Sequence, residues 1–469
     1  MQIRKHDIIE LHIDKMAFGG QAVARLEGFV VFVKGGVPGD RLTARVYKKK
    51  KDYAEARLVE ILVPSPDRVE APCPYSGYCG GCQWQHVRYE SQLVYKKQHV
   101  EESMRHIGAL QDIVVRDVIP SDKIFSYRNK MEFSFSGRRW ILPHEFDGSE
   151  SETGFALGLH APGNYSKVID MNACLLQIEE GNKILRLVKE YARGSGMPVY
   201  GIKTHQGFWR FLTIRYSTAF DQWMVNIVTS EERTSELKPL CDALVGEVGS
   251  IISIVNNINR KKASIAVGQK EIVLFGQETI KDRIGPFTFN VSANSFFQTN
   301  APGARKLYQC VADYAEFTGN ERVLDLYSGT GTIPIFLADK ALAVTGMEIS
   351  ESAVLDARKN CEENNVKNCN FICGDIRERL SAIDHRPDVL VIDPPRAGMH
   401  KEVLSQVMAL APDRIIYVSC NPATMARDLG QMTKDYQILE IQPVDMFPHT
   451  YHIESVANLR RRGGQLNLL

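Results

Sequence analysis

A cysteine near the C-terminal end of the sequence could serve as a nucleophile. Residues 418–429 read VSCNPATMARDL, so an apolar run ends at Ser419, Cys420 follows, and Asn421-Pro422 turns the chain. This pattern predicts a thiol at the end of a strand, at the edge of a sheet. Free cysteine is among the most buried residue types, so the pattern alone favours a core residue over a metal ligand or a nucleophile. A chemical role depends on what else the chain brings to that edge.

A carboxylate farther along the chain is suited to removing a proton. Glu454 lies in residues 447–456, FPHTYHIESV, where apolar neighbours predict a strand. An apolar setting raises the pKa of a carboxyl group toward neutrality, which suits a general base. A thiolate that adds to carbon 6 of uracil makes carbon 5 nucleophilic, and a base must then remove the carbon-5 proton. Cys420 and Glu454 could divide these steps, although Glu454 alone also fits an exposed strand residue.

A glycine turn and several acidic residues indicate a nucleotide site. Residues 323–332, VLDLYSGTGT, predict a strand, a turn and the start of a helix, but Pro334 replaces the third glycine of the dinucleotide fingerprint. Glu348, Asp375 and Asp393 close the next three predicted strands. The carboxyl ends of parallel strands face one crevice, although an acid there can also be a helix N-cap. Together they indicate an S-adenosylmethionine site, with Glu348 on the ribose and Asp375 at the adenine edge.

The remaining sequence indicates a multidomain chain that carries this α/β platform. Residues 1–62 contain five short strand patterns, typical of a small β-barrel of the oligonucleotide-binding type. Residues 63–86 and 118–285 predict a β-rich central α+β domain. Residues 87–117 predict a helix, and from 286 to 469 apolar strands alternate with helices, which indicates a Rossmann-like parallel sheet covered on both faces. We expect the segments 87–117 and 286–469 to form one C-terminal domain.

Composition restricts the compartment and the partners. The 469 residues include 57 Lys and Arg against 56 Asp and Glu, so binding to nucleic acid would depend on local patches. We see neither a signal-peptide pattern at the start nor an apolar stretch long enough to span a bilayer. Ten cysteines without a secretory signal suggest a reducing cytoplasm. The sequence shows no feature that demands an obligate protein partner.

A run of four lysines is the clearest basic patch. Residues 48–51 are all lysine, with Tyr47 and Tyr53 beside them. A solvated loop is one interpretation. On a small barrel with flanking aromatic residues, a role in tracking RNA phosphates is comparably favoured.

Three clustered cysteines suggest a bound inorganic group. Cys73, Cys79 and Cys82 have the spacing C-x5-C-x2-C, which supplies three thiolates and lacks the paired C-x2-C motifs of many zinc sites. The spacing alone leaves zinc and an iron–sulfur cluster equally open. A fourth ligand must come from elsewhere in the chain.

The combined motifs SCNPATMARDL, DPPR and HIESV resemble those of the RNA uracil-5-methyltransferases, a class I S-adenosylmethionine-dependent family that makes 5-methyluridine in 23S ribosomal RNA or transfer RNA. The resemblance covers essentially the whole chain. Met425 and Tyr451 depart from the commonest motif spellings without removing a functional group. The resemblance implies Cys420 as nucleophile and Glu454 as base. The implied donor-binding residues, with Asp393 also near the target base, are Gln298, Tyr327, Glu348, Asp375 and Asp393.

The same resemblance assigns the other parts of the chain. Residues 1–62 are similar to the RNA-binding TRAM domain of the family. Cys174 matches the family's fourth cluster position, which implies a 4Fe–4S cluster on Cys73, Cys79, Cys82 and Cys174. The barrel and cluster together favour 23S ribosomal RNA as substrate, with the T-loop of transfer RNA as the alternative. Two further alternatives are a non-catalytic RNA-binding iron–sulfur protein and an amino-methyltransferase, but the second would not need Cys420.

Overall fold

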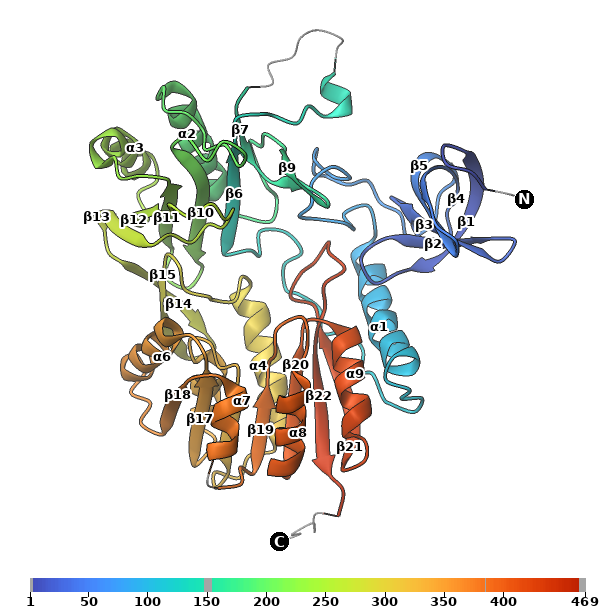
Figure 1. Ribbon diagram of the computed structural model, residues 1–469, viewed down its shortest axis with the longest axis vertical. Helices are drawn as coiled ribbons and strands as arrows, with labels where there is room; N and C mark the ends of the chain where they lie inside the picture. Colours follow the sequence, from blue (N-terminus) through green and yellow to red (C-terminus); the bar gives the residue numbers. More distant parts are fainter. Residues whose placement is uncertain (1–2, 147–153, 384, 464–469) are drawn as a thin grey trace.

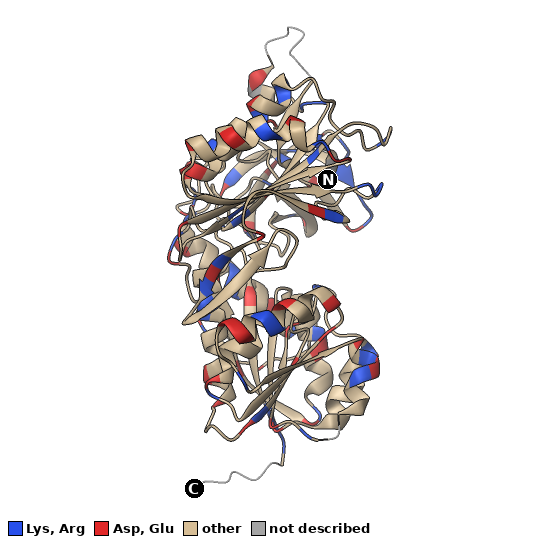
Figure 2. Ribbon diagram, turned by 90° about the vertical axis from the view of Figure 1, so that its left-hand side faces the viewer, with Lys and Arg blue, Asp and Glu red and all other residues tan. Residues whose placement is uncertain are grey.

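The computed structural model describes residues 3–146, 154–383 and 385–463 and arranges them as a small barrel and two large sheets (Figure 1). Figure 2, a side view, shows the two sheets stacked along the long axis of the molecule, with the C-terminal sheet at the lower end. Within the described residues, no helix is both long enough and apolar enough to cross a bilayer.

Five strands close the N-terminal barrel, as the sequence predicts. Residues alternate between core and solvent along β1, and Ile13, Val31 and Leu42 are fully buried in the barrel. Trp84, from the cysteine-rich segment, packs into the same core. The barrel order is β1-β2-β3-β5-β4, with β1(Ile8–Met16), β2(Ala22–Leu26), β3(Phe29–Lys34), β4(Arg41–Lys49) and β5(Tyr53–Val63).

A six-stranded mixed sheet forms the centre of the molecule. One face packs against helices α2(Glu179–Gly194) and α3(Thr234–Glu247) through a large apolar cluster. A short hairpin of β8(His160–Ala161) and β9(Asn164–Val168) lies beside β6 and β7. The sheet order is β13-β12-β11-β10-β6-β7, with β6(Lys130–Ser136), β7(Ala156–Gly158), β10(Trp209–Ser217), β11(Gln222–Thr229), β12(Ile251–Ile258) and β13(Lys270–Gly276).

The C-terminal sheet has seven strands in the order β18-β17-β16-β19-β20-β22-β21. The first five are parallel, and β22 and β21 are antiparallel to their neighbours. Almost every residue of β19 and β20 is buried, as expected for strands covered on both faces. The strands are β16(Arg322–Leu326), β17(Ala343–Glu348), β18(Cys369–Cys373), β19(Val389–Ile392), β20(Arg414–Ser419), β21(Tyr436–Val444) and β22(Glu454–Arg461).

Helices cover the two faces of this sheet with separate apolar clusters. One face carries α4(Ala301–Ala315), α5(Thr332–Ala338) and α6(Glu351–Glu363), together with the hairpin of β14(Thr279–Ile284) and β15(Phe287–Ser292). The other carries α1(Tyr89–His106), α7(Ile376–Arg379), α8(Lys401–Leu410) and α9(Pro422–Met432). Helix α1 packs against α9, and residues 115–119 pair with β21. We retain as a proposal the assignment of residues 87–117 to the C-terminal domain, together with the other domain boundaries.

Candidate active site

The predicted site residues come together because parallel strands end at one edge. Tyr327 follows β16, Glu348 ends β17, Asp375 lies two residues after β18, Asp393 follows β19 and Cys420 follows β20. These five strands run side by side in one direction. Their carboxyl ends therefore present these side chains to a single crevice.

Cys420 and Glu454 are neighbours across two antiparallel strands. Ser419, the last residue of β20, pairs with Ser455 of β22. Cys420 comes directly after Ser419, and Glu454, the first residue of β22, comes directly before Ser455, so the two residues lie at neighbouring strand ends. The Glu454 carboxylate acts electrostatically on the Cys420 thiol, so the two groups share one end of the crevice.

The loops around the thiol are fixed by hydrogen bonds. Asn421 caps α9 by accepting from the Ala423 amide at 3.1 Å, and its Nδ2 donates to the Arg396 carbonyl at 2.9 Å. The Asp-Pro-Pro-Arg loop and the turn after Cys420 are therefore bonded to each other. Cys420 immediately precedes the N-cap of an eleven-residue helix, where the helix dipole favours a thiolate.

Burial shifts the pKa of each ionisable group at this end. Burial raises the pKa of Asp393 to about 7, and burial together with Asp393 raises the pKa of Glu454 to about 8. Burial and the Glu454 and Asp393 carboxylates raise the pKa of the Cys420 thiol to about 11, whereas Arg396 opposes this shift. A cation bound in the crevice would stabilise all three groups in their charged forms. Glu454 also has the near-neutral pKa that suits a general base.

Asp325 belongs to the same acidic group, and the sequence analysis missed its role. It lies within β16 at 1% exposure, and neither carboxylate oxygen has a hydrogen-bond partner among the described residues. Burial, reinforced by Asp393 and Glu348, raises its pKa well above the ordinary value. The sequence did contain a signal for this group, because an aspartate inside the apolar run VLDL is expected to be buried. A buried acid needs a partner, so such a residue is a candidate for binding a ligand.

Glu348 and Asp375 have their carboxylates held in different ways. Glu348 accepts hydrogen bonds from the Gly329 amide at 3.0 Å and the Ser350 amide at 2.8 Å, which ties β17 to the glycine turn. Gly329 has a positive φ and open space where a Cβ would lie, so a ligand could approach its backbone. Asp375 caps α7 and binds Arg377, whose hydrogen bonds lower the pKa of Asp375 to about 2. Asp375 is therefore a helix N-cap, and it also lies at the strand end that faces the crevice.

The segment that carries Gln298 lies against the glycine turn. The Thr330 hydroxyl donates to the Phe296 carbonyl at 3.3 Å, and the Tyr308 hydroxyl contacts the Thr332 hydroxyl at 2.8 Å. The two preceding aromatic residues differ, since Phe297 is buried whereas Phe296 is 68% exposed. Phe296 is therefore available to stack on a base, and Phe297 is a core residue.

A buried ion pair holds the segment that leads into Glu454. Lys96 of α1 and Asp445, which follows β21, are both fully buried, with Nζ and Oδ1 2.6 Å apart. The Lys96 ammonium also donates to the Phe447 carbonyl at 3.1 Å, and Tyr89 donates to Asp445 at 2.9 Å. Helix α1 thereby fixes residues 445–447, only a few residues before Glu454.

His449 links this segment to the cysteine-rich region. Its carbonyl accepts from the amides of Gln83 and Trp84 at 2.9 Å each, and its own amide donates to Gln92 at 2.8 Å. Phe125 stacks on the His449 ring at 4.3 Å between centroids. Burial lowers the pKa of this imidazole to about 4, so it is neutral at physiological pH. The segment 445–452 thus contacts three other parts of the chain.

All four predicted cluster cysteines line one cavity of about 180 Å³. Cys79 and Cys174 are buried, whereas Cys73 and Cys82 are partly exposed. Burial raises the pKa of all four thiols, to about 12 for Cys79 and Cys82. In the part of the chain that the structure describes, no group of three or more Cys, His, Asp or Glu is arranged to hold a metal ion. The thiols therefore surround a common space without closing on one point.

The lysine run is only partly a loop. Lys48 and Lys49 end β4, and Lys50 and Lys51 lie in the turn that follows. Lys48 forms an ion pair with Glu55 of β5 at 2.5 Å, so the other three lysines carry most of the uncompensated charge of this patch.

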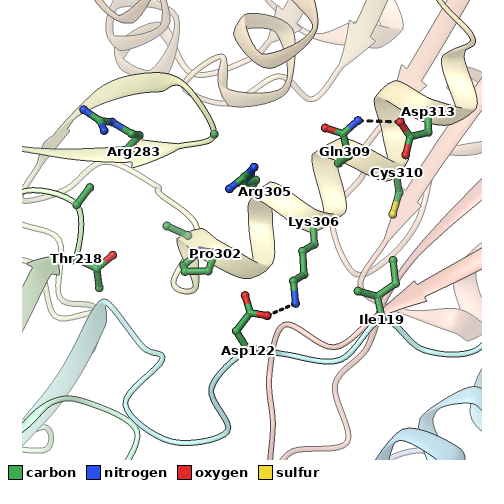
Figure 3. A pocket seen from close by; sticks show the side chains of 13 residues that line it. Ile119, Asp122, Thr218, Arg283, Pro302, Arg305, Lys306, Gln309, Cys310 and Asp313 are labelled. Atoms are coloured by element: carbon green, nitrogen blue, oxygen red, sulfur yellow. Dashed lines mark hydrogen bonds and ion pairs between the residues drawn. The ribbon is translucent and has the colours of Figure 1, made fainter.

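A cavity of about 590 Å³ lies away from this crevice, beside α4 (Figure 3). Arg305 and Lys306 of α4 and Arg283 of the β14–β15 hairpin line it, and Lys306 binds Asp122 at 2.5 Å. None of the predicted site residues contributes to its described lining. The acidic crevice, rather than this cavity, is therefore the candidate active site.

Comparison with known proteins agrees with this geometry. Residues 211–462 match the tRNA (Uracil-5-)-methyltransferase family, and residues 6–59 match the TRAM domain. An uncharacterised RNA methyltransferase of Chlorobaculum tepidum is 42% identical, over 98% of each chain, and one of Halalkalibacterium halodurans is 39% identical, over 97% of this chain and 98% of its own. The crystal structure of Pyrococcus abyssi tRNA (uracil-54, C5)-methyltransferase with S-adenosyl-L-homocysteine is similar at 30% identity and a TM-score of 0.75, over 96% of this chain and all of that chain.

The sheet order and the acidic crevice define an S-adenosylmethionine-dependent methyltransferase. The family match covers more than half of the chain. The chain belongs to the tRNA (uracil-5-)-methyltransferase family and is an S-adenosylmethionine-dependent RNA (uracil-5-)-methyltransferase.

Proposed function

We propose that this enzyme methylates carbon 5 of one uridine in 23S ribosomal RNA through a covalent adduct between Cys420 and the base. The observation that carries the proposal is that Cys420 and Glu454 lie at neighbouring strand ends, at the sheet edge where the predicted donor-site acids gather. A methyltransferase acting on an amino group would need neither side chain. A non-catalytic RNA-binding protein would need no such pairing of nucleophile and base.

The two residues divide the reaction between them. The Cys420 thiolate forms a bond to carbon 6, which turns carbon 5 into an enolate-like nucleophile. Bound S-adenosylmethionine supplies an electrophilic methyl group on a sulfonium, and carbon 5 takes that methyl as the sulfur–methyl bond breaks. Glu454 then removes the carbon-5 proton, and the bond between carbon 6 and Cys420 breaks to return the thiolate. The target nucleotide must leave its stack to expose its face to the thiol.

The residues around the crevice fit a cationic donor. Asp325 is buried without a partner among the described residues, and Glu454 and Asp393 share a site that raises the pKa of both. A sulfonium and an ammonium group are the cations that such a site would stabilise. We propose that Glu348, Gln298 and the other predicted donor residues, Tyr327, Asp375 and Asp393, hold this molecule.

Transfer RNA is the second candidate substrate, because the similar Pyrococcus abyssi enzyme acts on uridine 54 of transfer RNA. The decisive measurement is methyl transfer to unmodified 23S ribosomal RNA and transfer RNA transcripts, with nucleosides identified by mass spectrometry. We expect 5-methyluridine in the ribosomal transcript and at least about tenfold slower transfer to transfer RNA. Preference for transfer RNA would reverse the substrate assignment, and absence of 5-methyluridine from both would contradict the proposed function.

We also propose that Cys73, Cys79, Cys82 and Cys174 hold a 4Fe–4S cluster. Four thiols around one cavity supply the number and kind of ligands that such a cluster takes. The cavity lies beside Gln83 and Trp84, which bond His449, so the cluster would support the segment that leads to Glu454. We propose that the cluster has a structural role and that the enzyme works in the reducing cytoplasm.

Metal analysis tests the cluster. Protein purified without oxygen should contain about four iron atoms per chain and absorb broadly in the visible range. Cys79→Ser should lose this iron, whereas Cys241→Ser, a change at a buried cysteine outside the cavity, should retain it. One zinc per chain with no iron would contradict the assignment.

The barrel is proposed to bind RNA outside the crevice. Its TRAM match and its exposed Lys49, Lys50 and Lys51 support contact with phosphates. The barrel also reaches the catalytic segment, because Phe18 packs edge-to-face on Tyr451 at 5.5 Å between ring centroids.

A further inference from the structure

A second basic groove lies on the central sheet, outside the crevice and the barrel. It encloses about 580 Å³ between the ends of β6 and β9, the start of β10, the loop 200–204 and the loop after β12. Arg138, Lys203, Arg210 and Lys262 line it, and its described lining contains no Asp or Glu. Hydroxyl groups of serine, threonine and tyrosine complete the wall. Such a set of donors matches a phosphate-bearing ligand.

The cations of this groove form no ion pair with any residue that the structure describes. Within the described residues, Arg138, Lys203 and Lys262 have no carboxylate within salt-bridge distance. By contrast, Lys183, Arg186 and Lys238, on the helices that cover the sheet, each pair with a nearby glutamate or aspartate. Gathering unpaired like charges destabilises a fold through repulsion, so their arrangement calls for an anionic partner.

A buried arginine organises the groove. Arg210 is 4% exposed, and its guanidinium donates to the carbonyls of Asn259, Lys261 and Ala263 rather than to a carboxylate. The Tyr200 ring lies 4.1 Å from the guanidinium carbon. These bonds fix the loop that contains Arg260, Lys261 and Lys262. A loop with three consecutive cations is therefore held in one shape before any ligand binds.

The groove lies at the far end of the central sheet from the donor site. Arg215, near the end of β10, donates to the Ser295 carbonyl of the segment that carries Gln298, whereas Arg210 lies at the start of the same strand. Five residues of extended strand span roughly 15–20 Å. A ligand that reaches both places must be long, and the part of it that lies in the groove must carry negative charge.

We propose that this groove, lined by Arg138, Lys203, Arg210 and Lys262, binds the sugar–phosphate backbone of the substrate RNA several nucleotides from the target uridine. The inference rests on the proposed function for the identity of the substrate. The groove contributes affinity and placement without reading sequence, because charge and hydroxyl donors contact phosphates rather than base edges.

Charge removal tests this contact against a matched control. The groove variant is Arg138→Gln/Lys203→Gln/Lys262→Gln, and the control is Lys183→Gln/Arg186→Gln/Lys238→Gln, which removes the same charge from helices α2 and α3. Binding of labelled oligouridylates of about four and about 30 nucleotides is measured at several salt concentrations. Single-turnover methylation of the preferred full-length transcript is measured in parallel.

For the long oligomer, we expect the slope of log affinity against log salt concentration to be smaller in magnitude by about 2 in the groove variant than in wild type. The ratio of wild-type to variant affinity should therefore fall roughly 20-fold between about 50 and 200 mM salt. Binding of the short oligomer, affinity for S-adenosylmethionine and the methylation rate at saturating RNA should remain at wild-type values. An unchanged slope for the groove variant, or an equal change in the control, would overturn the proposal. If wild-type enzyme makes no 5-methyluridine while the slopes differ as expected, the proposed function is wrong. The proposed binding of RNA backbone in the groove would still hold.

Discussion

Replacing Cys420 by alanine is expected to lower methyl transfer by roughly 10⁴-fold or more, to the limit of detection. Carbon 5 of uracil is a poor nucleophile until a thiolate adds to carbon 6, and no other cysteine lies at this end of the described crevice. RNA binding should persist, because the thiol is one small contact among many. The measurement is methyl transfer from labelled donor, with RNA affinity measured on the same protein.

Glu454→Gln separates the base from the nucleophile. This variant should still form the bond to carbon 6 and accept the methyl group, but it cannot remove the carbon-5 proton. A protein–RNA species should therefore accumulate on denaturing gels, and mass spectrometry should find the RNA on Cys420. Wild-type enzyme should be trapped in the same way by an RNA with 5-fluorouridine at the target, since fluorine cannot leave as a cation.

Cys361→Ala provides a matched control, since Cys361 is a cysteine in α6 outside the candidate site. It should behave as wild type in both assays. Near-normal methylation by Cys420→Ala, or an adduct formed by that variant, would show that the thiol is not the nucleophile.

The sequence could predict which residues meet at one edge of the sheet, because strand direction determines where strand ends lie. An apolar strand that ends in an acid or a cysteine occurs four times after the strand that carries the glycine turn, and this is enough to place Glu348, Asp393 and Cys420 at one edge. The closed five-stranded barrel followed from alternation and turn residues in the same way. The resemblance to a family added roles to these positions, and those roles remain predictions.

The features that were missed depend on contacts between distant residues. Asp325 looked like one more strand residue until its burial without a partner was visible. The cations of the central groove come from separate loops, so the sequence shows them only as scattered charges. The Lys96–Asp445 pair joins residues 349 positions apart, and neither position carries a local signal of burial.

Breaking this buried pair by Lys96→Met is expected to destabilise the C-terminal part of the molecule by about 3–5 kcal/mol. Lys96 and Asp445 are both fully buried, so the substitution leaves a carboxylate without its counter-charge in a site that water does not reach. The Tyr89 hydroxyl and the Phe447 amide still donate to Asp445, but neither is charged. The corresponding transition should fall by roughly 6–20 °C in thermal unfolding followed by circular dichroism.

The adjacent residue supplies the control for this substitution. Lys97 is on the same helix, and its ion pair with Asp117 at 2.7 Å is exposed, so Lys97→Met should leave the transition unchanged. The double variant Lys96→Met/Asp445→Asn should regain part of the loss, because it also removes the buried charge.

A second effect should appear in catalysis at a temperature where Lys96→Met is folded. With residues 445–447 released, Glu454 should remove the carbon-5 proton more slowly, and the covalent species should persist longer than in wild type. A Lys96→Met protein that matches Lys97→Met in both thermal transition and adduct lifetime would show that the pair neither stabilises nor positions this segment.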